Sequence, residues 1–181
     1  MQWPLYSRQW FEVGNCGLAI PPGYRDDGNA MISFSGTDLL TMDTKGRVAL
    51  PARYRQPLSE LCGARLKITL PAKPDDRLLV LYPLPEWDSV QAQLKALPST
   101  KPFEFLRRRI VGHAKDLEPA QQARMLLPPE LRSEARLEQR IAIVGQINKL
   151  EIWSEPLYRE AMAPERVSAE ELDAALAEVS L

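Results

Sequence analysis

The sequence has very little of the chemistry that metal sites and catalytic sites use. It contains two cysteines, Cys16 and Cys62, and one histidine, His113, so a zinc site and a disulfide framework are not expected. It has no glycine-rich phosphate loop, no Gly-x-Ser-x-Gly motif and no pair of carboxylates in an apolar setting. We therefore expect a protein that is not an enzyme and that uses no cofactor, no metal and no small-molecule substrate.

Long apolar runs and a strong charge imbalance are also missing. No apolar run approaches about 18 residues, which is the length expected of a membrane helix, and no continuous apolar stretch marks a signal peptide. The small number of cysteines fits a reducing cytoplasm. The net charge is −1, which argues against general coating of nucleic acid.

The charge is nevertheless distributed unevenly. Residues 43–55 hold four basic side chains against one acidic one, and residues 101–115 hold five against one. Residues 150–181 hold eight acidic side chains against two basic ones. A local basic surface can bind phosphates on a protein that is neutral overall. The run Arg107-Arg108-Arg109 is interpreted as the solvated face of a helix, with a phosphate or interface contact as the alternative.

One pattern occurs twice in the chain. The first copy is Asp43-Thr44-Lys45-Gly46-Arg47 followed by Val48-Ala49-Leu50-Pro51, and the second is Ala120-Gln121-Gln122-Ala123-Arg124 followed by Met125-Leu126-Leu127-Pro128. Downstream, Tyr82 and Trp87 are matched by Trp153 and Tyr158, again five residues apart. This order indicates an internal duplication. Modules of about 50 residues are too small to be stable alone, so we expect the halves to share a core.

The local patterns predict an α+β chain with a pseudo-twofold layout. We expect a hairpin over residues 37–50 that turns at Asp43 and Gly46, because Asp is favoured at the first turn position and Gly allows a positive φ. A short helix should carry Ala52 to Arg55 and be ended or bent by Pro57. The other elements expected in the first half are strands at 65–70 and 78–82, a helix over 87–97, and a helix after Pro102 with Leu106, Ile110 and Ala114 on one face. In the second half we expect a turn and strand near 120–127, a short helix from Pro128, strands near 141–144 and 147–152, a helix after Pro156, and a last helix from the capping box at Ser168 through Val179.

The Asp43–Gly46 turn carries the candidate functional residues. A turn of this kind holds Arg47 at the start of a strand, where an arginine can reach two acceptors on a guanine edge. Phosphate contacts fix the register of a protein on DNA, and the residues assigned to them are Lys45, Arg53 and Arg55. The alternative is a solvent-exposed hairpin with an incidental arginine. Arg124 occupies the same place as Arg47 in the second copy, which favours a function.

The remaining conspicuous side chains have structural interpretations. His113 is expected to pack or cap near the end of a helix, and it has no catalytic or metal-ligating partner. The aromatic pairs at 82/87 and 153/158 are expected in the core where a strand meets a helix. A platform for stacking bases would need exposed, closely spaced aromatic rings, which this spacing does not provide.

These segments, taken in order, resemble the MraZ family between about Met31 and Tyr158. The matching motifs are Asp43-Thr44-Lys45-Gly46-Arg47, Leu50-Pro51, Arg53-Tyr54-Arg55, Leu79-Val80-Leu81-Tyr82-Pro83-Leu84-Pro85-Glu86-Trp87, Gly112-His113-Ala114 and Val144-Gly145-Gln146-Ile147-Asn148-Lys149. The resemblance implies two SpoVT-AbrB-like domains of the swapped-hairpin type. It also implies a bacterial transcriptional regulator that assembles into rings and usually represses its own division and cell-wall gene cluster by binding short direct repeats in the promoter.

The resemblance assigns a DNA-contacting role to Arg47, with Lys45 in the same turn, and Arg124 corresponds to it in the second domain. The second copy departs from the family pattern, because Ala120 and Ala123 stand where Asp and Gly are expected. Ala resists the positive φ that Gly accepts, so we expect a reshaped second turn. Asp116 could replace the missing acid only with a shifted spacing.

The sequence thus predicts a sequence-specific, double-stranded-DNA-binding homo-oligomer in the cytoplasm, associated with the nucleoid. The alternative is an oligomeric protein-interaction scaffold that no longer recognises DNA. The expected segments are a disordered extension or an over-long start at 1–30, a first SpoVT-AbrB-like domain at 37–86, connecting helices at 87–113, a second domain at 114–157 and a C-terminal helical segment at 158–181.

Overall fold

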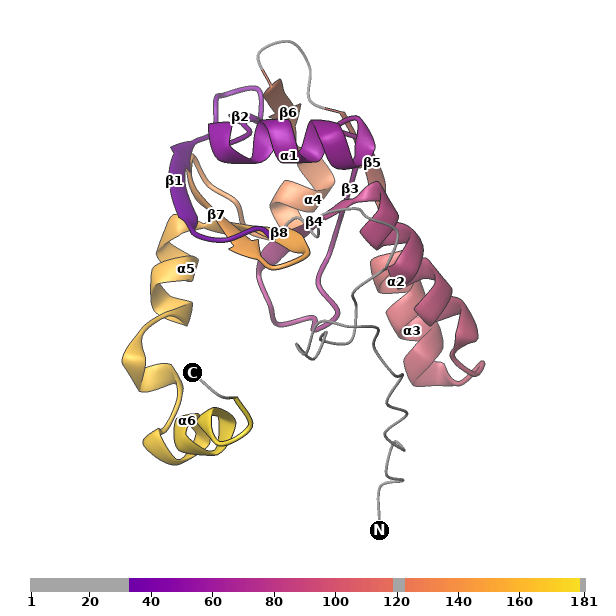
Figure 1. Ribbon diagram of the computed structural model, residues 1–181, viewed down its shortest axis with the longest axis vertical. Helices are drawn as coiled ribbons and strands as arrows, with labels where there is room; N and C mark the ends of the chain where they lie inside the picture. The colour runs from indigo at the N-terminus through magenta and orange to yellow at the C-terminus, as the bar shows by residue number, and fades with distance from the viewer. Residues whose placement is uncertain (1–32, 119–122, 180–181) are drawn as a thin grey trace, which may run out of the picture. The chain divides into compact units, whose positions relative to one another are not determined.

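The computed structural model of the protein describes residues 33–118 and 123–179. The prediction for residues 1–30 therefore lies outside the described residues. Two antiparallel sheets and several helices make up the described part, which confirms the α+β class (Figure 1). One sheet has six strands in the order β1-β7-β8-β4-β3-β5, and the other pairs β2 with β6.

The six-stranded sheet is built from both halves of the chain. Its strands are β1 (Thr37–Thr41), β3 (Leu66–Thr69), β4 (Leu78–Pro83), β5 (Lys115–Leu117), β7 (Arg140–Gln146) and β8 (Lys149–Ser154). Each strand has a counterpart in the other half: β1 corresponds to β5, β3 to β7 and β4 to β8. If every strand is exchanged for its counterpart, the result is the same strand order read from the opposite edge of the sheet. The pseudo-twofold relation expected from the duplication is thus present in the topology, with its axis between β4 and β8.

The first two strands do not form the expected hairpin. The chain does turn at Asp43–Gly46, but β1 pairs with β7, and β2 (Arg47–Ala49) pairs with β6 (Arg124–Leu126) of the other half. A local turn sets the direction of the chain, while the pairing partner is chosen by which strand completes the buried face. This exchange between halves is compatible with a swapped-hairpin module.

A single hydrophobic core joins the two halves, as the size of the repeats predicted. The strands β7 and β8 alternate between the faces, so that Ile141, Ile143 and Ile152 are fully buried. They share one cluster with residues of the first half such as Leu58 and Leu79. Each half alone would leave this apolar surface in water, which explains why the two halves share one core and do not form two separate ones.

The first helix, α1 (Ala52–Cys62), does not end at Pro57. Tyr54, Leu58 and Cys62 are buried at intervals of four residues, so their burial holds the helix together across the hydrogen bond that Pro57 cannot make. The helix stops at Gly63, which has a left-handed φ of 59° and whose N–H donates to the Ser59 carbonyl at 2.9 Å. This is the usual glycine end of a helix.

The other helices lie close to their expected positions. They are α2 (Leu84–Ala96), α3 (Lys101–Ile110), α4 (Pro129–Glu134), α5 (Glu155–Ala161), a 3-10 turn at Pro164–Arg166 and α6 (Ala169–Leu176). The predicted capping box is present, since Ser168 Oγ accepts from the Glu171 N–H and Glu171 Oε2 accepts from the Ser168 N–H. The helix ends at Leu176, short of the predicted Val179.

Candidate functional site

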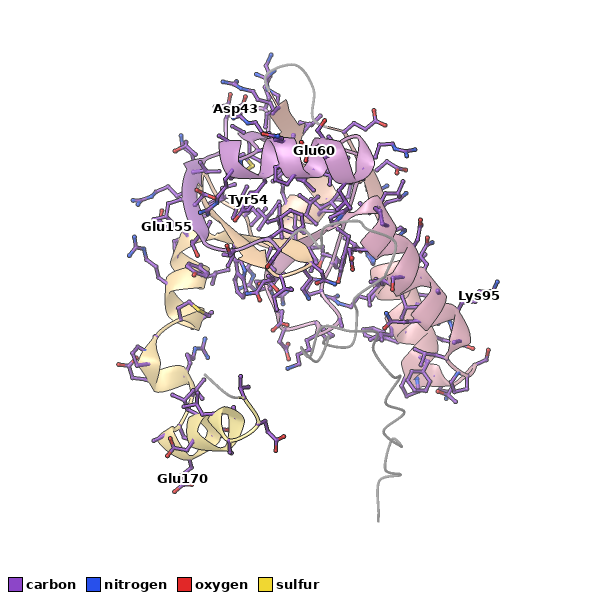
Figure 2. The ribbon with its side chains drawn as sticks, in the orientation of Figure 1. Asp43, Tyr54, Glu60, Lys95, Glu155 and Glu170 are labelled. Atoms are coloured by element: carbon purple, nitrogen blue, oxygen red, sulfur yellow. The ribbon has the colours of Figure 1, made fainter. Side chains whose placement is uncertain are left out.

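The Asp43 carboxylate organises the turn that carries Arg47. Its Oδ1 accepts hydrogen bonds from the backbone N–H groups of Lys45 and Arg47, both at 2.9 Å, and its Oδ2 accepts from Arg47 Nε at 2.8 Å. The Gly46 N–H donates to the Asp43 carbonyl at 2.9 Å, and Gly46 has a φ of 82°. The sequence predicted both turn residues, and the structure adds that Asp43 also holds the arginine side chain. Asp43 lies at the start of this turn, and its label is found above α1 in the view of Figure 2.

These contacts stabilise the ionised form of Asp43. The backbone N–H of Arg47 is the largest influence that holds the pKa of this carboxyl below its usual value, and the Arg47 side chain and the Lys45 N–H act in the same direction. The carboxylate is therefore charged at neutral pH. The Arg47 side chain remains 43% exposed, so its guanidinium is oriented by Asp43 without being covered.

The β2–β6 ribbon brings the two equivalent arginines onto one face. In its register Arg47 stands opposite Leu126, and Arg124 stands opposite Ala49. The central pair, Val48 and Met125, is buried at 1% and 0% exposure. Because side chains alternate across a strand, the arginines lie on the opposite, exposed face. Arg47 and Arg124 come from positions 77 residues apart in the chain, and the pairing of β2 with β6 places them on a single ribbon. The two strands are labelled in Figure 1.

Two symmetric hydrogen bonds lock the ends of the ribbon. The Leu50 N–H donates to the Ala123 carbonyl at 2.8 Å, and the Leu127 N–H donates to the Gly46 carbonyl at 3.0 Å. Ala123 has a φ of 54°, in the same left-handed region as Gly46. The expectation that alanine would avoid this conformation is wrong for Ala123 itself, since the strand pairing on both sides imposes it. Residues 119–122 of the second turn lie outside the described residues.

An arginine from α4 lies against the first turn. A β-carbon added to Gly46 would be 2.5 Å from Cζ of Arg132, so the guanidinium occupies the space that a side chain would take. The equivalent residue of the first half, Arg55, instead donates from Nε to the Leu50 carbonyl at 2.9 Å. Sequence reasoning assigned Arg55 to phosphate and gave Arg132 no role. The signal for Arg132 was its place four residues after Pro128, which matches that of Arg55 after Pro51.

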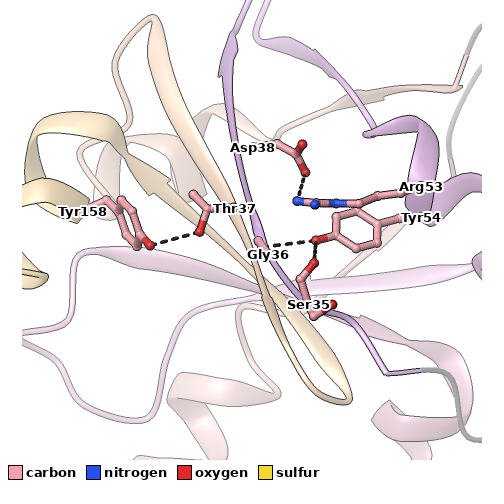
Figure 3. Close-up of polar contacts among 7 residues, drawn as sticks. All are labelled: Ser35, Gly36, Thr37, Asp38, Arg53, Tyr54 and Tyr158. Atoms are coloured by element: carbon pink, nitrogen blue, oxygen red, sulfur yellow. Dashed lines mark hydrogen bonds and ion pairs between the residues drawn. The ribbon is translucent and has the colours of Figure 1, made fainter.

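Arg53 has partners within its own half. Its guanidinium donates to the carboxylate of Asp38 and lies 4.9 Å from the centre of the Tyr54 ring (Figure 3). The Tyr54 hydroxyl donates to the Ser35 carbonyl at 2.7 Å, which ties α1 to the segment before β1. The side chain of Arg53 is 44% exposed. It therefore serves the packing of α1 and still presents part of its charge to water.

The second basic segment is mostly occupied by structural contacts. Arg107 donates to the carbonyls of Leu94 and Leu97 at 3.3 and 3.1 Å, and Arg109 donates to the Pro71 carbonyl at 2.7 Å. Arg108 is 78% exposed and pairs with Glu104 within α3. The prediction of a solvated helix face thus holds for Arg108, whereas the other two arginines bind loops.

The other side chains discussed from the sequence also have structural partners. His113 Nδ1 lies 3.0 Å from the Arg109 carbonyl at the end of α3, as expected for a capping histidine, and it is exposed. The aromatic pairs repeat, with ring centres 6.0 Å apart for Tyr82 and Trp87 and 6.1 Å apart for Trp153 and Tyr158. The prediction that all four rings lie in the core is wrong, since Trp87 is buried and the other three are half-buried. Asp116 lies in β5 and pairs with Lys67 at 2.7 Å, so it does not replace the missing turn acid.

The site offers positive charge on an exposed ribbon. Within residues 33–118 and 123–179, no cluster of His, Cys, Asp and Glu could hold a metal ion. Over the same residues, no helix is long and apolar enough to span a bilayer. A pair of arginines on a two-stranded ribbon is suited to contact with an extended polyanion.

Comparison with known proteins agrees with the internal duplication. The family model of the MraZ protein, described as antitoxin-like, matches twice, over residues 33–109 and 110–179. A transcriptional regulator MraZ of Nitrosococcus oceani is 42% identical over 139 residues, which are 76% of this chain and 92% of that protein. The proteins of the same name from Halorhodospira halophila and Pseudomonas aeruginosa are 40% and 41% identical, over 79% and 75% of this chain and 93% and 89% of their own lengths.

Proposed function

The chain belongs to the MraZ family of transcriptional regulators, which is not an enzyme family, and from this we propose that it binds double-stranded DNA through the exposed face of the β2–β6 ribbon. The observation that carries the proposal is the register that sets Arg47 and Arg124 on one exposed face. A two-stranded ribbon fits the major groove of DNA, where each base pair presents a distinct pattern of donors and acceptors.

Arg47 is the main base-contacting residue in this proposal. Asp43 accepts a hydrogen bond from Nε of Arg47, which leaves both terminal nitrogens of the guanidinium available. An arginine that presents two donors can bind O6 and N7 of guanine together. The contact with Asp43 orients the side chain before DNA arrives, and this lowers the entropy lost on binding. Arg124 is proposed as the second base contact.

Phosphate contacts are proposed for Lys45, Arg53 and Arg55, with Lys45 first. Lys45 is exposed in the turn beside Arg47, and it forms no ion pair with any described residue. Arg53 and Arg55 already have partners inside the protein, Asp38 and the Leu50 carbonyl respectively. They can contribute charge near the ribbon, but their removal should also disturb α1.

The proposed target is a set of short direct repeats in the promoter of the protein's own gene. One ribbon offers few contacts, so a single module should bind weakly. A homo-oligomer, in the form of a ring, would present several ribbons and raise affinity through effective concentration. Binding at these repeats would repress the division and cell-wall gene cluster to which the gene belongs, and it would place the protein on the nucleoid in the cytoplasm. The two SpoVT-AbrB-like domains at 37–86 and 114–157 would each supply one strand of the ribbon.

A gel-shift experiment with the DNA upstream of the gene tests the proposal. The full chain should retard this fragment and not a shuffled fragment of the same composition, and R47A should abolish the specific shift. R108A is the matched control, because it removes an arginine that is 78% exposed and pairs with Glu104 on α3. If the single variants R47A and R124A both still retard the upstream fragment specifically, the ribbon is excluded as the DNA-binding surface.

The second candidate is an oligomeric scaffold without DNA recognition. It is favoured by the net charge of −1 and by Ala120 and Ala123, which replace the turn residues of the first copy. Under this alternative the purified oligomer forms normally and binds upstream and shuffled DNA equally weakly. The same gel shift, combined with light scattering for the oligomer, therefore separates the two functions.

A further inference from the structure

Leu126 is a large apolar side chain in an unusual place. It is 56% exposed, although its neighbours in sequence, Met125 and Leu127, are both completely buried. The ribbon register sets it directly opposite Arg47, on the same exposed face as the two arginines. Burial of Leu126 plays little part in the fold, because the core contacts of β6 are made by Met125 from the other face.

The pseudo-symmetry of the ribbon makes the position of Leu126 informative. Arg47 corresponds to Arg124, Val48 to Met125 and Ala49 to Leu126, and the pairing register follows this relation. A fully symmetric ribbon would offer the same side chains in both orientations on DNA. Leu126 breaks the symmetry. The residue opposite Arg47 is Leu126, with a long apolar side chain, whereas the residue opposite Arg124 is Ala49, which is shorter and half-buried.

The apolar group that DNA exposes in the major groove is the 5-methyl group of thymine. Side chains directly opposite each other on an antiparallel pair have β-carbons about 4.5–5.5 Å apart, and successive base pairs are separated by about 3.4 Å. When Arg47 contacts a guanine, a leucine opposite it can thus reach an adjacent base pair. No polar atom of Leu126 could compete for a hydrogen bond there, so the contact would select for a methyl group.

We propose that Leu126 contacts the 5-methyl group of a thymine next to the guanine bound by Arg47, and that this contact gives the ribbon its direction on the DNA. The proposal rests on the proposed function, since it takes the β2–β6 ribbon as the DNA-binding surface. It adds a specificity-determining residue and the chemical group that this residue recognises. It also predicts that the end of the ribbon at Arg124 and Ala49 discriminates bases less sharply.

The test removes single methyl groups from the DNA. In one repeat of the operator each thymine is replaced in turn by deoxyuridine, which lacks only the 5-methyl group, and binding of the full chain is measured by fluorescence anisotropy. For the unmodified protein, one replacement beside an essential guanine should weaken binding about three- to fivefold, the amount expected for one buried methyl group. In L126A the same replacement should have no effect, while replacements elsewhere act as before.

Two controls keep the outcomes distinct. L39A removes another exposed leucine, on β1 outside the ribbon, and should retain the deoxyuridine profile of the unmodified protein. Thermal melting should show that L126A and L39A are folded. If no deoxyuridine position distinguishes L126A from the unmodified protein while specific binding persists, the role of Leu126 is overturned and the DNA-binding function stands. If the unmodified protein binds no specific sequence, the proposed function falls, and the role of Leu126 falls with it.

Discussion

Gly46 and Arg132 are in direct contact across the two halves of the chain. The guanidinium of Arg132, on α4 of the second half, fills the position that a β-carbon of Gly46 would occupy, and its Nε is buried with no hydrogen-bond partner among the described residues. The turn that carries Arg47 therefore rests on a side chain from the other repeat. At the equivalent place in the second repeat stands Ala123, and the equivalent arginine, Arg55, donates to the Leu50 carbonyl instead. The turn with glycine therefore has an arginine packed against it, whereas the arginine that corresponds to the turn with alanine binds a backbone carbonyl.

Substitution of Gly46 by alanine should destabilise the protein. An alanine at a φ of 82° is strained, at a cost of roughly 1–2 kcal/mol, and its β-carbon must also displace Arg132. G63A is the matched control, because Gly63 has a positive φ of 59° and no atom within 4 Å of an added β-carbon. Urea denaturation should show a greater loss for G46A than for G63A.

A double-mutant cycle isolates the contact with Arg132. In the R132A background the β-carbon of G46A meets no guanidinium, so the additional cost of G46A over G63A should disappear. An unchanged cost in that background would show that the strain of the backbone, and not the contact with Arg132, explains the whole effect.

The two ribbon arginines should not be equivalent in DNA binding. Arg47 is oriented by Asp43, whereas Arg124 forms no ion pair with any residue in the described part of the chain. R47A should remove roughly 1–3 kcal/mol of discrimination per site, and R124A should remove less. Anisotropy titrations on the same operator fragment, with melting temperatures as the folding control, measure both. A greater loss in R124A would reverse this ranking of the two halves.

Binding should depend strongly on salt and on the number of repeats in the DNA. Each phosphate that the protein neutralises should contribute about −0.9 to the slope of log affinity against log salt. K45A should reduce the magnitude of that slope by about this amount at every sequence, without changing base preference. Operators with one, two and three repeats should show steeply increasing affinity. Equal affinity for all three would contradict the avidity of a ring.

Stability at low pH should depend on Glu155. Its carboxylate is 6% exposed and accepts hydrogen bonds from Arg140 at 2.7 and 2.8 Å and from Arg159 at 2.9 Å. The hydrogen bond from Arg159 is the largest influence that holds the pKa of Glu155 below its ordinary value of 4.5, and Arg140 acts in the same direction. Because the folded state lowers this pKa, the contribution to stability is present above pH 4.5 and is lost as the pH falls through the lowered pKa.

The variant E155Q tests this relation. Its stability deficit relative to the unmodified protein should be constant from neutral pH down to about 4.5, the ordinary pKa, and should shrink below it. E160Q is the control, because Glu160 pairs with Arg166 at the surface, with both side chains more than half exposed. Such pairs contribute little to stability. A deficit of E155Q that does not change between pH 7 and pH 3 would show that packing, not charge, is what the residue supplies.

Much of the local structure was predictable because it depends on residues close together in the chain. The Asp43–Gly46 turn, the capping box at Ser168 and the aromatic pairs at strand-to-helix junctions all involve neighbours within about five positions. Of the two alternatives for Pro57, an end or a bend of the first helix, the end is wrong for a non-local reason. The buried contacts of Leu58 and Cys62 continue the helix beyond the missing hydrogen bond.

The pairing of arginines with backbone carbonyls was not predictable in the same way. Nothing in the run Arg107-Arg108-Arg109 distinguishes the arginine that binds the Pro71 carbonyl from the one that lies in water. The loop that supplies this acceptor is 38 residues away in the chain, and only packing of α3 brings the two together. The same holds for Arg132, whose contact at Gly46 joins the two repeats.

The sequence by itself determined the duplication, the α+β class, the turn with its arginine and the family, because each is carried by residue type and short spacing. Only the tertiary structure decided which strands pair. β1 joins β7 and β2 joins β6, since strand partners are selected by the shared core and not by the turn that connects neighbours. That choice places Arg47, Arg124 and Leu126 on one exposed face. The distance of 77 residues between the two arginines hides this arrangement in the sequence, because contacts so far apart form only when the two halves fold around one core.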